Sequence, residues 1–241
     1  MIHYHGTPIA CSDDQVSRIM NGRHAFVSFA HTSQLSLVQE VCQTWALDNG
    51  AFSFWKSGKQ TDWSEYYEFI ENLKSPNMDF FIIPDVIQGD EEENDRLIQE
   101  RPNLNCLGVP VFHTSESLDR AERLADQFPL IALGSSEGLH PGTDTWWMRI
   151  NEIMEALCDE NGKPKTKIHG LRMLNPDVFK KIPFASADST SVARNTSNSY
   201  RFNGGYKPLS SHVRGQILID RIESFNAPQF WKKQPIQLSL L

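Results

Sequence analysis

Cysteine is scarce in this sequence and is never clustered. The four cysteines, Cys11, Cys42, Cys106 and Cys158, lie far apart, and no two of them form a Cys-x-x-Cys pair. Scattered cysteines favour reduced, partly buried thiols over a disulfide framework or a zinc knuckle. We therefore expect neither a metal site built from cysteines nor a bound cofactor.

Long apolar runs are also missing. No apolar stretch approaches the roughly 20 residues that a membrane-spanning helix needs. The opening residues 1–5, Met-Ile-His-Tyr-His, do not resemble a signal peptide. Internal repeats, linkers rich in Gly or Ser, and low-complexity tracts do not occur. These absences predict a cytoplasmic protein with no membrane partner.

Basic residues are few in the first two thirds of the chain and common in the last third. Residues 1–160 hold 10 Lys or Arg and 26 Asp or Glu, a net charge of -16. Residues 161–241 hold 13 and 4, a net charge of +9, so the overall charge is -7. A basic C-terminal third suits a surface that follows phosphates, although a solvated face without a ligand gives the same pattern.

What the chain does contain is a regular alternation of short β-like runs and longer amphipathic stretches. We expect strands at Ile2–His5, His24–Phe29, Trp45–Leu47, Phe80–Ile83, Gly108–Phe112, Leu130–Leu133, Lys167–His169 and Phe184–Ala187. We expect helices near 12–20, 34–43, 62–74, 89–100, 115–127, 143–158, 174–180 and 212–225.

Eight strands, each followed by a helix, predict a parallel sheet closed into a (β/α)8 barrel of the TIM type. The length of 241 residues suits one such domain. We assign residues 1–225 to the barrel and 226–241 to a C-terminal tail, and we interpret 189–211 as a long functional loop. A doubly wound open sheet is the competing fold.

Polar residues follow the predicted strands, where the chemistry of such barrels lies. These positions are His5, His31, Asp48-Asn49-Gly50, Asp85, His113, Gly134-Ser135, His169 and Asp188-Ser189. Three of them are aspartates directly after apolar strands, and a carboxylate there is costly to bury unless it is paired or functional. We therefore expect Asp48, Asp85 and Asp188 to meet at one mouth.

Paired carboxylates suit cleavage at an acetal-like carbon, because one attacks the anomeric carbon while the other handles a proton. An N-glycosidic bond follows the same logic. A third carboxylate can accept hydrogen bonds from the N–H groups of a guanine edge. Phe52 offers an apolar face for the flat base.

Four segments in order resemble motifs of the tRNA-guanine transglycosylases and, more closely, of their smaller DNA-modifying relatives in phages and bacteria. Residues 47–52, Leu-Asp-Asn-Gly-Ala-Phe, resemble the family's Thr-Asp-Ser-Gly-Gly-Phe/Tyr motif, and residues 81–85 its strand ending in the aspartate that reads guanine. Residues 131–134 resemble its Leu-Gly-Gly strand, and 187–195 the stretch holding the nucleophilic aspartate and an Ala-Arg-Asn sequence.

The resemblance implies a role for each matching residue. Asp188 would be the nucleophile and Asp48 the general acid/base. The base would be held by Asp85, by Phe52 and by the Gly134 backbone. His113 departs from the family pattern, because it stands where a base-binding Gln is expected.

Further expectations complete the site. We place the remaining strand-end residues in the substrate pocket: Asn49, Gly50, Ser135 and His169. Candidates for phosphate contacts come from the basic C-terminal third: Arg194, Arg201, Lys207 and Arg214.

A second departure concerns the substrate. The Cys-x-Cys-x-x-Cys zinc module that follows the nucleophile in tRNA-modifying members is absent. The resemblance then implies exchange of guanine in DNA, with the base flipped from the duplex, for a 7-deazaguanine derivative that protects phage DNA from restriction. If the chain is phage-encoded, it would act in the host cytoplasm. Relatives can form homodimers, and tRNA remains the alternative substrate.

Two other functions stay open on the sequence. His3, His5, His113, His169 and Asp188 resemble the ligand pattern of metal-dependent amidohydrolase-like barrels. That reading lacks the bridging lysine on strand four that many such barrels use. The other possibility is a barrel that binds nucleic acid without exchanging bases.

Overall fold

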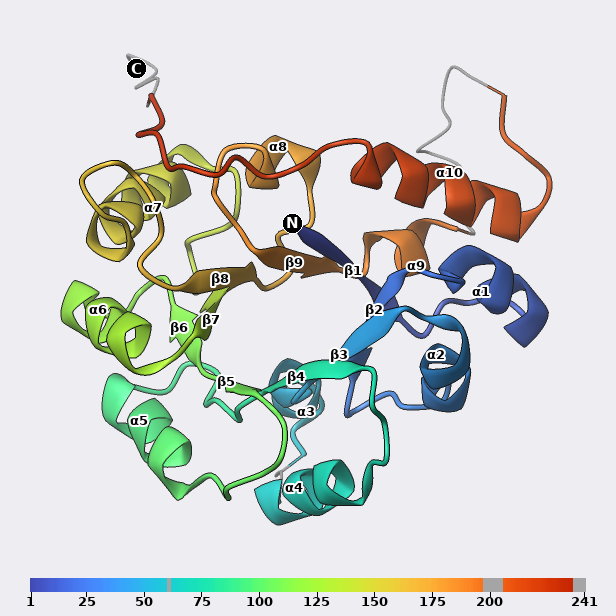
Figure 1. The fold of residues 1–241 in the computed structure, drawn as a ribbon, viewed down its shortest axis with the longest axis horizontal. Helices are drawn as coiled ribbons and strands as arrows, with labels where there is room; N and C mark the ends of the chain where they lie inside the picture. Colours follow the sequence, from blue (N-terminus) through green and yellow to red (C-terminus); the bar gives the residue numbers. More distant parts are fainter. Residues whose placement is uncertain (60–61, 197–205, 236–241) are drawn as a thin grey trace.

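The computed structural model describes residues 1–59, 62–196 and 206–235, and within them the chain forms one α/β domain around a nearly closed barrel of nine parallel strands (Figure 1). The strands are β1 (Ile2–Thr7), β2 (His24–Ser28), β3 (Thr44–Asp48), β4 (Met78–Ile82), β5 (Gly108–Val109), β6 (Val111–His113), β7 (Leu130–Gly134), β8 (Lys167–Gly170) and β9 (Ser186–Ser189). Their order in the sheet is β5-β4-β3-β2-β1-β9-β8-β7-β6.

The two edges of this sheet meet at Pro110, which stands between β5 and β6. β5 pairs with β4, and β6 pairs with β7. The carbonyl of Pro110 still accepts a hydrogen bond of 2.9 Å from the amide of Ala132 in β7. Because proline has no N–H to give to a ladder, the strand expected over Gly108–Phe112 is divided into two short pieces.

Helices surround the strands (Figure 1). In the described residues they are α1 (Asp13–Met20), α2 (Leu35–Val41), α3 (Ala51–Ser57), α4 (Trp63–Asn72), α5 (Glu91–Glu100), α6 (Leu118–Gln127), α7 (Asp144–Leu157), α8 (Pro176–Phe179), α9 (Ser191–Asn195) and α10 (Ser211–Glu223). Side chains cap several of them, as the sequence predicts. Asp62 accepts from the Ser64 amide, Ser117 from that of Arg120 and Asn175 from that of Asp177.

Alternate residues of each strand point to opposite faces, and this divides the core in two. The barrel interior is filled by residues such as Tyr4, Phe26, Phe80 and Ala132. A larger cluster lies between the strands and the helices and includes Trp45, Phe112 and Trp146. Any side chain on the inner face at the carboxyl ends of the strands therefore faces the mouth.

All eight expected strands and eight expected helices are present, with small changes at their ends. Two helices were missed, α3 and α9, and both lie within loops that follow strands of the candidate site. Of the predicted loop 189–211, residues 191–195 form α9, and 197–205 lie outside the described residues. No helix in the described part of the chain combines the length and apolar character needed to cross a membrane.

The segment after α10 packs on the domain where the structure describes it. The Met1 ammonium group donates to Asn226 Oδ1 at 2.5 Å. The segment then passes α8 towards α7 (Figure 1). Trp231 is buried in the outer core cluster, and its amide donates to the Gly162 carbonyl at 2.6 Å. Residues 226–235 are thus part of the folded domain.

Candidate active site

The three predicted aspartates lie at the carboxyl ends of their strands. Asp48 is the last residue of β3, Asp85 follows β4 by three residues, and Asp188 lies near the end of β9. Ala46 faces the barrel interior, so Asp48, two residues further on, shares that face. Burial and then the charges of Asp188 and Asp85 raise the pKa of Asp48 to about 6, against the lowering effect of Arg172. The three carboxylates are therefore close enough for the charges of Asp85 and Asp188 to affect the ionisation of Asp48.

Asp188 is buried but keeps one oxygen unused. Its Oδ1 accepts a hydrogen bond of 2.7 Å from the backbone amide of Arg172. Its backbone carbonyl accepts from the Leu174 amide at 2.9 Å, which ties the loop after β8 to β9. Within the described residues, Oδ2 accepts no hydrogen bond. The carboxylate is thus held through one oxygen while the other can react.

His169 contacts Asp188 from the barrel interior. It is fully buried in the barrel interior, stacked on Phe26 with 5.2 Å between the ring centroids. Its Nδ1 is 2.8 Å from Ser186 Oγ, and Nε2 lies 3.4 Å from Asp188 Oδ1. Direct contact of His169 with a substrate stays a prediction, and in this structure the side chain contacts Ser186 and Asp188.

Asn49 is likewise a support for a carboxylate. The side chain is buried, and its Nδ2 donates to Asp85 Oδ1 at 2.7 Å and to the Ile83 carbonyl at 3.0 Å. Its Oδ1 accepts from the Ala51 amide at the start of α3 at 2.8 Å. All these groups are used within the protein, so Asn49 orients Asp85 rather than binding substrate.

His113 lies between two carboxylates. Nε2 is 3.0 Å from Asp85 Oδ2, and Nδ1 is 3.3 Å from Glu116 Oε1. Burial lowers the pKa of this imidazole, but the hydrogen bonds and charges of Asp85 and Glu116 outweigh it and raise the pKa to about 9. At neutral pH His113 is therefore a cation that fixes the second oxygen of Asp85.

Glu116, which the sequence did not single out, extends this network to α6. Its Oε2 accepts from the His113 amide at 2.8 Å and from Arg120 at 2.5 Å. Arg120 is completely buried and also pairs with Asp95 at 2.8 Å. A glutamate three residues after the strand-end histidine is the sequence signal that points to this partner.

Phe52 lies on α3 close to the loop after β8. The ring is 38% exposed, and the guanidinium carbon of Arg172 is 4.2 Å from its centroid. Gly50 precedes α3 with φ of +78°, and a Cβ there would come within 3.0 Å of the Ala30 amide nitrogen. Gly50 therefore serves the tight turn that presents Phe52.

Gly134 and Ser135 follow β7 at the same end of the barrel. The Gly134 carbonyl accepts from the Thr114 amide at 3.0 Å, so it is already in use. A Cβ on Gly134 would come within 3.1 Å of Val111 Cγ1, so a larger residue there would require Val111 to shift. Ser135 is exposed beside it.

The predicted phosphate contacts divide into three groups. Arg194 on α9 and Lys207 are exposed. Arg201 lies outside the described residues. Arg214 is buried and donates to the carbonyls of residues 196, 208 and 209 at 2.5–2.8 Å. The phosphate role expected for Arg214 was wrong, because its guanidinium holds the chain together.

The ligand set of the metal-site alternative is not assembled. His3 Nε2 is 3.0 Å from the Phe225 carbonyl, and His5 Nε2 is 2.9 Å from Glu223 at the end of α10. Both therefore point outward to α10, whereas Asp188 faces inward. In the described part of the chain, His, Cys, Asp and Glu nowhere form a group of three able to hold a metal ion.

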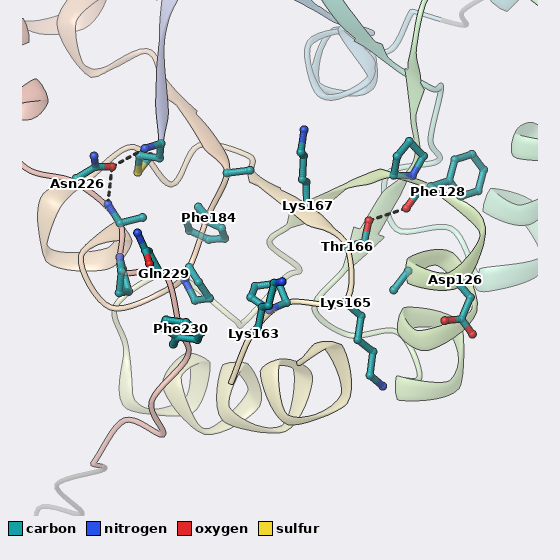
Figure 2. Close-up of a pocket in the computed structure, with 18 of the residues that line it drawn as sticks. Asp126, Phe128, Lys163, Lys165, Thr166, Lys167, Phe184, Asn226, Gln229 and Phe230 are labelled. Carbon is teal, nitrogen blue, oxygen red and sulfur yellow. Dashed lines mark hydrogen bonds between the residues drawn. The ribbon is translucent and has the colours of Figure 1, made fainter. Parts of the chain in front are cut away.

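A wide groove lies at the opposite end of the barrel (Figure 2). Its lining comes from the segments that precede strands and from the tail: Met1, 125–129, 163–167, 183–185 and 226–230. Lys163, Lys165 and Lys167 surround it together with Phe184 and Phe230. None of the candidate site residues contributes to this groove.

Comparison with known proteins does not add a family to this geometry. No family model and no curated protein matches the chain.

Proposed function

We propose that this protein is a transglycosylase that exchanges a guanine base in DNA for a 7-deazaguanine derivative. The observation that carries the proposal is the group formed by Asp188 with a free oxygen, Asp48 with its pKa raised to about 6, and Asp85 held by two donors. These are the three roles that base exchange requires: nucleophile, proton carrier and guanine reader.

The architecture supports the same proposal. If β5 and β6 are counted as one strand interrupted by Pro110, the sheet has eight strand positions. It is then a (β/α)8 barrel of the TIM type, and such barrels carry their chemistry at the carboxyl ends of the strands. Asp48, Asp85 and Asp188 stand at those ends.

In the first step, Asp188 Oδ2 attacks C1′ of the target nucleotide as the bond from C1′ to N9 of guanine breaks. The product is an ester between Asp188 and the sugar, and guanine leaves with the electron pair of that bond. Asp48 in its protonated form delivers a proton to the leaving base. A pKa near the working pH lets one carboxyl group both give and take a proton.

In the second step, the incoming base reverses this path. The Asp48 carboxylate removes the N9 proton of the 7-deazapurine, N9 attacks C1′, and the ester bond to Asp188 breaks. Two displacements at C1′ retain its configuration, as in glycosidases with a carboxylate nucleophile.

Asp85 fits the recognition of the guanine edge. A carboxylate has about four lone-pair positions, and Asn49 and His113 each use one, on different oxygens. Each oxygen can therefore accept one further hydrogen bond, as the two adjacent N–H donors of guanine require. Phe52 would stack on the face of the same base.

The preference for DNA over tRNA rests on a module that the sequence lacks. The zinc module that holds tRNA in related enzymes has no counterpart in the sequence. The exposed cations Arg194 and Lys207 lie in the segments after β9, close in the chain to Asp188. They are suited to phosphate contacts with either nucleic acid.

A base-exchange assay tests the proposal. Duplex DNA and tRNA carrying labelled guanine are incubated separately with the protein and 7-cyano-7-deazaguanine, and released guanine is counted. We expect release from DNA by the wild type and a loss of at least about 10³-fold with Asp188→Asn. Retention of full activity by Asp188→Asn would refute the mechanism.

Other outcomes of the assay separate the alternatives. Release from tRNA alone would keep the chemistry and change the substrate. Binding of nucleic acid without release, and without any effect of Asp188→Ala, would indicate a barrel that binds and does not exchange.

A further inference from the structure

Arg172 touches both halves of the candidate site, and the sequence did not single it out. Two residues after β8 its backbone adopts a left-handed conformation with φ of +57°. For a residue other than glycine this conformation is uncommon, and such residues cluster at functional sites. The conformation accompanies the 2.7 Å hydrogen bond from the Arg172 amide to Asp188 Oδ1.

The side chain of Arg172 covers the face that the base would need. Its guanidinium carbon is 4.2 Å from the centroid of the Phe52 ring. A stacked base lies at about the same height above an aromatic ring, so guanidinium and base exclude each other on that face of Phe52. A cation–π contact at an exposed site is weaker than the stacking of a base on an aromatic ring. An arriving base can therefore displace the arginine.

Once displaced from the ring, the guanidinium can pair with another anion. Arg172 is exposed, and among the described residues it forms no ion pair. A nucleotide whose base stacks on Phe52 and whose C1′ faces Asp188 places its own phosphates one sugar away from the same loop. Arginine binds phosphate with two parallel hydrogen bonds, a geometry that lysine does not offer.

Building on the proposed function, we propose that Arg172 is a positioning residue with two states. In the empty site its guanidinium covers Phe52. When the target base enters, the guanidinium leaves the ring and binds a phosphate beside the flipped nucleotide. One residue thus keeps the stacking surface covered and then holds the substrate strand.

Equilibrium binding without turnover tests this. The two probes are free 7-cyano-7-deazaguanine and a short DNA duplex with a single G·C pair, each titrated against wild type, Arg172→Ala and Arg172→Lys at several salt concentrations. With Arg172→Ala we expect equal or up to about threefold tighter binding of the free base. We expect the duplex to bind five- to tenfold more weakly, with a salt slope smaller by about 0.9.

Arg172→Lys keeps the charge, so its salt slope should equal that of the wild type. Arg18→Ala is the control, since this exposed arginine on α1 pairs with Asp14 and is remote in the sequence from every candidate site residue. Equal losses for both probes in Arg172→Ala would overturn the proposal, because they would show a structural role alone. A salt slope of nucleic-acid binding that is unchanged in Arg172→Ala would also overturn the proposal.

The design separates this inference from the proposed function. A wild type that binds both probes but releases no guanine would refute the exchange activity, and the ratio between variants would still report on Arg172. A wild type that binds neither probe would refute both.

Discussion

The Nε2 atom of His169 lies 3.4 Å from Oδ1 of Asp188, with the imidazole fully buried beneath the carboxylate. This nitrogen has no hydrogen-bond partner among the described residues. The imidazole therefore acts on Asp188 by contact and orientation, and Ser186 fixes the ring from the other side.

We expect His169→Leu to lower the rate constant of base exchange by about 10²-fold, because a small misplacement of a reacting group has effects of this size. KM should change little, since His169 is buried and contacts Asp188. His169→Gln, which keeps a donor near Asp188, should recover much of the rate. Steady-state kinetics of the three proteins would measure this, and a change confined to KM would contradict it.

Asp48 links activity and stability through its pKa of about 6. The folded protein holds this proton more tightly than the unfolded chain, so stability falls as pH rises from about 4 to above 6. Asp48→Asn should therefore raise the free energy of unfolding at pH 8 by up to about 3 kcal/mol. The gain should vanish near pH 4, while exchange is lost at every pH.

Urea denaturation at pH 4, 6 and 8 measures this difference. A variant less stable than the wild type at pH 8 would show that the Asp48 carboxylate stabilises the fold, which contradicts the raised pKa.

His113 gives the opposite dependence on pH. Its pKa in the folded protein is about 9, above the 6.5 of a free histidine, so its stabilisation is complete below pH 6.5 and is lost as pH rises through 9. His113→Gln should cost on the order of 3 kcal/mol at pH 6 and much less at pH 10. Denaturation curves of the wild type and the variant at pH 6 and pH 10 measure this difference. A loss of unfolding free energy that is the same at both pH values would exclude the charged pairing with Asp85 and Glu116.

Trp231 tests whether the segment after α10 belongs to the domain. Trp231 is 8% exposed, whereas its neighbour Phe230 is 47% exposed. Trp231→Ala should lower the free energy of unfolding by about 3 kcal/mol, as for other buried aromatic residues, and Phe230→Ala should change it by less than about 1 kcal/mol. Thermal melting of both variants measures these changes. Equal losses of stability would mean that the segment after α10 contributes no side chain to the hydrophobic core.

The sequence was sufficient to predict a parallel α/β fold and the strand-end position of the three carboxylates. Apolar runs of strand length alternate with helical patterns, and an aspartate directly after such a run has to lie at the strand end. Asp48, Asp85 and Asp188 could therefore be found without coordinates. α3 was missed because its seven residues, Ala-Phe-Ser-Phe-Trp-Lys-Ser, follow Gly50 immediately and are too short to show helical periodicity.

The supporting residues could not be predicted, because their partners are distant in the sequence. In the sequence nothing distinguishes Arg214 from other basic residues. Only the structure shows that its guanidinium donates to the carbonyls of residues 196 and 208. His169 and Asn49 stand at strand ends, yet both side chains are buried, and Asn49 donates to Asp85 and to the Ile83 carbonyl. The position of Arg172 depends on a left-handed backbone conformation that no sequence pattern predicts.

Pro110 makes one part of the barrel wall weaker than the rest. The carbonyls of Val109 and Pro110 bond to opposite neighbours, Ile83 and Ala132, but proline supplies no amide towards β7. One rung of the ladder is therefore missing where β5, β6 and β7 meet. Local opening of the sheet should begin there. The amide hydrogens of Val111 and Ala132 should therefore exchange with solvent sooner than those of β1 or β2.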